Sequence, residues 1–146
     1  MSSLSKIYQD VAAQDISLFL YPIGFTDAAS ICLNGRYAIF LDFSKFPSLR
    51  AYTEALAHEC GHCATGAMHT VSSPYDLVEK HEYKANRWAF ERYLPFEELA
   101  LAMGRGYTEA WQLAEYYGFP EDFIRAALCY YTQNKGLRFD GFSPKS

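Results

Sequence analysis

The chain has 146 residues, about half of them hydrophobic, and a formal net charge of −4. This length is enough for one domain with a sizeable core, and it requires no second domain. The acidic balance gives no general reason to bind nucleic acid or anionic lipid. The N-terminus has neither a basic start nor an apolar segment typical of a signal peptide, and no apolar run is long enough to span a bilayer. We therefore expect a cytoplasmic protein without membrane contact.

Two β segments are predicted in the first third of the chain. A strand is expected from Ile16 to Tyr21, and a hairpin is expected from Ala28 to Phe43. The hairpin turn falls at Asn34-Gly35, a residue pair that favours the positive φ angles of a two-residue β-turn. The sequence therefore predicts a small antiparallel sheet.

The next predicted helix opens at Pro47-Ser48, ends near Gly66, and contains the string His58-Glu59-Cys60-Gly61-His62. His58 and His62 lie one helical turn apart on one face, so both imidazoles can reach a single tetrahedral metal. Glu59 lies on the flank of that face, where it can act as general base toward a water molecule on the metal. The larger apolar residues share the opposite face: Leu49, Tyr52, Leu56, Cys60 and Cys63. Small residues near the histidine face leave room for a metal and a substrate: Ala51, Ala55 and Gly61.

H-E-x-x-H is a short motif, and an ordinary helix with two surface histidines is the alternative interpretation. A hydrolytic zinc site needs a third protein ligand, and Glu82 is the best candidate, because it follows His62 by 20 residues. A second helix is predicted from Pro74 to Leu94, with Ser73 as its N-cap. Glu82 shares a face with four packing residues: Val78, Ala85, Ala89 and Tyr93.

A carboxylate within a packing stripe is costly unless it is paired or coordinates a metal. A solvated helix carboxylate is the other interpretation of Glu82. Glu79 and Glu91 rank below it, because they lie at the edge and on the far side of that face. His81 faces away from Glu82, so we expect no ligand role for it.

Together these residues resemble the ImmA/IrrE family of metallo-endopeptidases, which occurs on phages, mobile elements and bacterial chromosomes. In that family an H-E-x-G-H helix is followed by an E-x-x-A-N/D-x-F/W-A helix, whose first glutamate completes a zinc site. Here the second motif is Glu82-Tyr83-Lys84-Ala85-Asn86-Arg87-Trp88-Ala89, closed by Leu94-Pro95. The resemblance is clear over roughly residues 31–95 and loose over the C-terminal third. Cys60 replaces a position that is often aliphatic in the family, and Trp88 replaces one that is often Phe.

The resemblance implies zinc on His58, His62 and Glu82, with Glu59 as catalytic base. It also implies a hydrolase that cleaves one intracellular protein, typically a helix-turn-helix repressor of a phage or mobile element. We expect a single α+β domain over residues 1–146. Residues 1–95 would form a small antiparallel sheet with a zincin-type active-site helix, and residues 96–146 a mainly helical part. Two histidines and a carboxylate with an open position suit zinc in a hydrolase, and the sequence leaves Mn²⁺ and Fe²⁺ open.

Three features around the site stay open at this level. An edge strand of the hairpin is expected to align a substrate backbone by strand addition, unless every strand is already paired or covered. His69 and Tyr93 are candidate donors to the oxyanion formed during peptide hydrolysis. Cys60 and Cys63 form a C-x-x-C string, but it lies inside a helix and points away from the histidines, so we expect both to be buried thiols.

Two other functions are considered. The first is a catalytically silent relative that keeps zinc and acts as a binding module. The second is a DNA-binding regulator, because residues 108–131 resemble a helix-turn-helix with its turn at Gly118. The prospective reading helix of that segment begins with Glu121-Asp122 and offers only Arg125 as a cation. Phosphate-tracking elements are basic, so we expect a protein substrate and no direct contact with nucleic acid.

Overall fold

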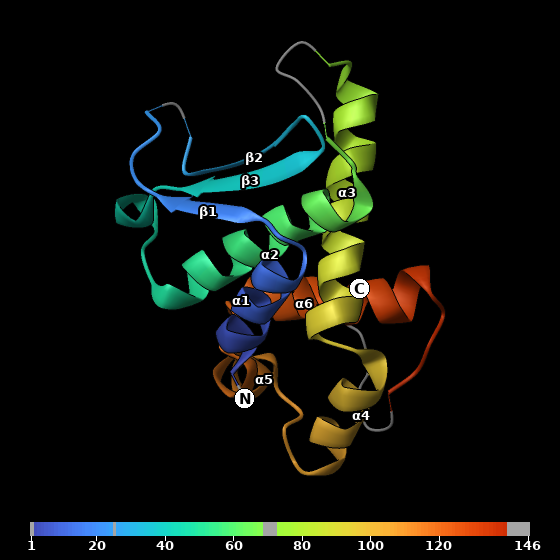
Figure 1. The fold of residues 1–146 in the computed structure, drawn as a ribbon. Coiled ribbons are helices and arrows are strands. Elements are labelled where there is room, and N and C mark those ends of the chain that lie inside the picture. The colour runs from blue at the N-terminus through green and yellow to red at the C-terminus, as the bar shows by residue number, and fades with distance from the viewer. Residues whose placement is uncertain (1, 25, 69–72, 140–146) are drawn as a thin grey trace.

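The computed structural model describes residues 2–24, 26–68 and 73–139 and has the predicted α+β fold (Figure 1). Its strands are β1 (Ser17–Leu20), β2 (Ala28–Leu33) and β3 (Arg36–Leu41). Its α-helices are α1 (Ser3–Ala13), α2 (Leu49–Thr65), α3 (Tyr75–Tyr93), α4 (Phe96–Gly104), α5 (Ala110–Tyr117) and α6 (Glu121–Cys129). A 3-10 turn (Phe43–Lys45) and a π-helical turn (Tyr130–Asn134) complete the described elements. Within these ranges no helix is both long and apolar enough to cross a membrane.

The sheet has the strand order β1-β3-β2 and is mixed. β2 and β3 form the expected antiparallel hairpin, whose turn residues Asn34 and Gly35 have φ angles of 54° and 77°. β1 pairs in parallel with β3, so the predicted antiparallel arrangement holds for β2 and β3 only. The reason is that β1 and β2 follow each other in the sequence but are not neighbours in the sheet. β3 then fills the position between them and runs in the direction of β1.

Helix α2 lies beneath the sheet and has the predicted limits (Figure 1). The Ser48 side chain caps its first turn by accepting a hydrogen bond from the Ala51 amide, and Gly66 ends the helix in the left-handed conformation. Tyr52, Leu56 and Cys60 are fully buried on its back. Leu49 is exposed, contrary to the prediction, because it occupies the first position of the helix, beyond the core.

Helix α3 crosses α2 and continues past it, as Figure 1 shows at the right of the molecule. Ala85, Ala89 and Tyr93 are buried, as its apolar stripe predicts. The helix starts one residue later than expected: Pro74, and not Ser73, is the N-cap. Pro74 has the extended ψ of 146°, and its carbonyl accepts hydrogen bonds from the amides of Leu77 and Val78.

The other helices lie on the side of α2 away from the sheet (Figure 1). Helix α1, which the sequence analysis did not predict, packs on both α2 and α3 and buries Ile7 and Val11. Helices α5 and α6 form the predicted C-terminal pair, with Gly118 in the left-handed conformation between them. Its apolar anchors Ala114 and Ile124 are fully buried, so this pair belongs to the core.

Candidate metal centre

The α2–α3 crossing brings the three predicted ligands together. The helices approach closely at Gly61, where a Cβ atom would collide with the backbone carbonyl of Ala85. Ala85 lies one turn after Glu82 on α3, and Gly61 lies directly before His62 on α2. The absence of a side chain at Gly61 therefore allows the Glu82 carboxylate to reach the histidine face, whereas the prediction for Gly61 was that it leaves room for a metal and a substrate.

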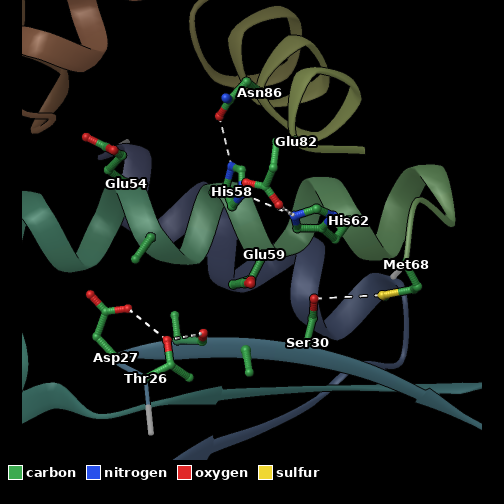
Figure 2. Close-up of a pocket in the computed structure, with 13 residues that line it drawn as sticks. Thr26, Asp27, Ser30, Glu54, His58, Glu59, His62, Met68, Glu82 and Asn86 are labelled. Carbon is green, nitrogen blue, oxygen red and sulfur yellow. Dashed lines mark hydrogen bonds and ion pairs between the residues drawn. The ribbon is translucent and has the colours of Figure 1, made fainter. Parts of the chain in front are cut away.

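The ligand atoms converge on one small volume (Figure 2). His58 Nε2 lies 2.7 Å from Glu82 Oε2, and His62 Nε2 lies 2.9 Å from Glu82 Oε1. The two Nε2 atoms are 3.1 Å apart. Two ligand atoms on a tetrahedral zinc are separated by roughly 3.3 Å, given bonds of about 2.0 Å. The cluster is therefore slightly tighter than a zinc site, and a small outward movement of the side chains accommodates the ion.

The outer nitrogen of each imidazole faces a carbonyl oxygen. His58 Nδ1 lies 2.8 Å from Asn86 Oδ1, and His62 Nδ1 lies 2.7 Å from the Ala67 backbone oxygen. Since both partners accept hydrogen bonds, each Nδ1 is the donor, and the lone pair of each neutral ring is on Nε2. When a metal is bound, both lone pairs would be directed at it together with the Glu82 carboxylate. Such a set of converging acceptors fits a cation, and carbonyl partners on the outer nitrogen are typical of metal-bound histidine.

The charges of the cluster agree with this interpretation. Hydrogen bonds from His58 and His62 hold the pKa of Glu82 far below its usual value, although partial burial acts in the opposite direction. Burial disfavours protonation of His58, but Glu82 outweighs it and raises the pKa of that imidazole. A divalent cation between the three side chains would supply positive charge that balances the Glu82 carboxylate.

Glu59 lies beside the cluster and is not one of its ligands. Its side chain points from α2 toward β2, into the space between them (Figure 2). It is only 7% exposed, and within the described part of the chain no hydrogen-bond donor reaches its Oε2 atom. Burial raises the pKa of this carboxyl group, as do the charges of Glu82 and Asp27, and the two histidines oppose the rise. A buried carboxylate with an unpartnered oxygen next to a metal-binding cluster suits a proton acceptor.

A cleft of about 610 Å³ opens in front of these residues. Strand β2 forms its floor with Ala28, Ala29 and Ser30, and helices α2 and α3 form its roof. In the described sheet β2 pairs only with β3, so its other edge lies at the cleft, where the Ala28 backbone oxygen accepts a hydrogen bond from the Thr26 hydroxyl at 3.2 Å. Within the described sheet β2 is thus an edge strand, and the alignment of a substrate along it stays a prediction.

Other predicted residues lie elsewhere or are not described. Tyr93 is buried and donates a hydrogen bond to Asp10 at 2.7 Å, so its proposed role as an oxyanion donor is wrong. It lies 11 residues beyond Glu82, a distance of roughly 16 Å along the helix axis. His69 lies outside the described residues. Asn86 has a role that the sequence did not predict; the signal was its position one turn after Glu82, where it meets His58.

The cysteines and the C-terminal helices contribute no ligand to this cluster. Cys60 and Cys63 are buried free thiols, as predicted, and burial raises the pKa of Cys63 to about 12. In the C-terminal pair Arg125 already contacts Glu121 at 3.3 Å and Asp122 at 3.8 Å. The cation on the prospective reading helix is thus engaged by acidic neighbours.

No model of a known protein family matches this chain, and neither a curated protein nor a solved structure matches it. The activity must therefore be inferred from the residues of the site.

Proposed function

We propose that this chain is a zinc-dependent endopeptidase that resembles the ImmA/IrrE family. The arrangement of the ligand atoms and Glu59 supports this proposal most strongly. Three ligand atoms from two helices converge, and the buried Glu59 carboxylate faces the same cleft with an unpartnered oxygen. A structural metal site typically has four protein ligands and no open position. A three-ligand cluster at a cleft suits a catalytic site better.

Each residue of the site would have its own role in the reaction. His58, His62 and Glu82 would hold zinc, with Asn86 and the Ala67 carbonyl orienting the two rings. Zinc, when bound, would polarise a water molecule and the carbonyl of a peptide bond. Glu59 would accept a proton from the water as its oxygen attacks the carbonyl carbon. The same carboxyl group would then protonate the amine as the carbon–nitrogen bond breaks.

The substrate backbone would align along β2. A peptide in extended conformation can add to the free edge of this strand through main-chain hydrogen bonds. Such binding is independent of sequence, so selectivity would come from the side chains that line the cleft. The family resemblance suggests that the substrate is an intracellular protein, such as a phage or mobile-element repressor, and that the enzyme acts in the cytoplasm.

The first test is metal content, measured by elemental analysis on the purified chain and on Glu82→Ala. We expect about one zinc per chain, as a site with two histidines and a carboxylate predicts, and a sharp loss in the variant. A chain that binds no metal after reconstitution would contradict the proposal.

The second test is proteolysis by the zinc-loaded chain and by Glu59→Gln, with mass spectrometry of a peptide library. The variant keeps the shape of the side chain but cannot accept a proton, so we expect a loss of at least about 100-fold in turnover with zinc retained. Stoichiometric zinc without any cleavage would instead favour the silent binding module.

A further inference from the structure

One end of the cleft carries two carboxylates that the proposed mechanism does not use. Glu54 lies on α2, one turn before His58, and Asp27 directly precedes β2. Both line the cleft, and Figure 2 draws them at the same end, on opposite walls. Ala55, the residue after Glu54 on α2, also lines the cleft and has only a small side chain.

These carboxylates have no cationic partner in the described structure. No lysine or arginine there approaches Glu54 or Asp27 within the 4.0 Å that defines the observed ion pairs. The nearby Lys45 is held by the Thr26 carbonyl oxygen at 3.4 Å and by Asp42. Among the residues that line the cleft there is no lysine or arginine.

Further negative charge surrounds this end. The pKa of Glu54 is raised, first by burial and also by the charge of Asp122 on α6, with His58 opposing. Glu59 adds a carboxylate that is more than nine-tenths buried and whose unpartnered Oε2 atom faces the same cleft. A metal ion would compensate Glu82 and part of the charge of Glu59. It would leave the half-buried Glu54 and the exposed Asp27, which accepts a hydrogen bond from the Thr26 hydroxyl at 3.5 Å, without a lysine or arginine partner in the described structure.

The direction of β2 determines which part of a substrate meets this end. β2 begins at Ala28, next to Asp27, and runs toward Leu33. A peptide that adds antiparallel to β2 runs the opposite way, so its C-terminal part lies over Asp27 and Glu54. The residue that enters this end would therefore follow the scissile bond.

We infer that the cleft selects substrates with a lysine or arginine on the C-terminal side of the cleaved bond, and that Glu54 and Asp27 determine this selectivity. The inference rests on the proposed function. A long cationic side chain can extend along the small Ala55 and place its charge between the two carboxylates, where charge-assisted hydrogen bonds are stronger than neutral ones.

The test uses three peptide hydroxamates on the zinc-loaded chain. They differ only in the side chain that follows the zinc-binding group: arginine, methionine or glutamate. Calorimetry measures their Kd values without requiring turnover. We expect the arginine compound to bind about tenfold more tightly than the methionine compound, and the glutamate compound to bind most weakly.

The variants assign the effect to residues. Glu54→Gln and Asp27→Asn should each reduce the arginine advantage and leave the methionine compound unchanged, which also shows that the variant is folded. The matched control is Glu97→Gln on α4, an exposed carboxylate that does not line the cleft, which removes the same charge and should change nothing.

Each other outcome has a distinct meaning. Equal binding of all three compounds would overturn the selectivity and leave the peptidase proposal intact. An arginine advantage that survives both substitutions would overturn the assignment to Glu54 and Asp27. If no hydroxamate binds the zinc-loaded chain, the proposal of an accessible zinc centre is wrong, and the proposed function is wrong as well.

Discussion

Asn86 is the residue whose side chain fixes His58 in the ligand cluster. Its Oδ1 atom accepts the Nδ1 proton at 2.8 Å, which keeps the Nε2 lone pair directed at the site. We expect Asn86→Ala to weaken zinc binding by roughly 10- to 100-fold, the usual effect of losing such an outer partner. Competition with a chromophoric chelator measures this. Asn86→Asp keeps an acceptor and should retain affinity; equal affinity of the alanine variant would contradict the role.

Asp10 is a buried carboxylate that joins α1 to the end of α3. It accepts hydrogen bonds from Arg92 Nε at 2.9 Å, Arg92 Nη2 at 2.6 Å and the Tyr93 hydroxyl at 2.7 Å. Burial alone would raise its pKa, but these hydrogen bonds and the charge of Arg92 outweigh burial and lower it. A carboxyl group with a lowered folded-state pKa stabilises the fold above its unfolded-state pKa, and this contribution disappears as pH falls through the folded-state value.

The lowered pKa of Asp10 predicts how Asp10→Asn changes stability at different pH values. Near neutral pH the free energy of unfolding of the variant should be about 1–2 kcal/mol lower than that of the parent chain. Arg92 and Tyr93 lose their charged acceptor, but the loss is limited because the half-exposed Arg92 remains solvated. The difference from the parent chain should shrink as the pH falls below about 4. Urea unfolding at neutral and acidic pH measures both values. A difference that is equal at both pH values would mean that Asp10 acts by packing alone.

The ligand residues illustrate how much of a site a sequence can predict. His58, Glu59 and His62 share one helix, so their relative positions follow from helical geometry. Glu82 was found because a carboxylate in an apolar stripe requires an explanation. Tyr93 satisfied the same face criterion but lies too far along the helix. A shared helix face predicts the direction in which a side chain points but not its position along the helix axis. The crossing point of α2 and α3 decides which residue of α3 meets the two histidines.

At the scale of elements, the α2–α3 crossing depends on Gly61. Its missing side chain allows the backbone of α3 to approach at Ala85. We expect Gly61→Ala to push the helices apart, destabilise the fold by about 1–3 kcal/mol and weaken zinc binding, because Glu82 then moves away from the histidines. Thermal unfolding and zinc titration measure the two effects.

The matched control is Gly104→Ala in the last turn of α4, where an added Cβ meets no atom within 4 Å. This substitution should be neutral or stabilise by up to about 1 kcal/mol, because alanine favours helix. Similar losses in both variants would show that the close approach at Gly61 is not the cause.

Local signals predicted the elements better than their pairing. The Asn34-Gly35 turn, the helix start at Pro47-Ser48 and the helix end near Gly66 are each encoded within a few residues, and the structure confirms them. The parallel pairing of β1 with β3 joins two strands that do not follow each other in the sequence, so no comparable local signal encodes it. The pairing of β1 with β3 matters for the proposed function, because it leaves β2, and not β3, at the edge of the sheet next to the cleft.

At the scale of the whole molecule, the proposed metal centre connects the two helices around which the described core is built. His58 and His62 belong to α2, and Glu82 belongs to α3. Helix α1 packs on both, and the sheet packs on α2. Unfolding would therefore separate these three side chains and release any ion that they hold, so the proposed zinc binding would be thermodynamically linked to global stability.

This linkage predicts that a chelator lowers the Tm of the zinc-loaded chain. Zinc at 1,000 times its Kd stabilises a folded protein by about 4 kcal/mol, which for a chain of this size corresponds to roughly 10 °C in Tm. Glu82→Ala, which lacks a ligand, should show a much smaller shift with EDTA. Calorimetry of both chains, each with and without EDTA, measures the four values. Equal shifts in the two chains would mean that the stabilising ion binds elsewhere, because only the site at the α2–α3 crossing requires Glu82.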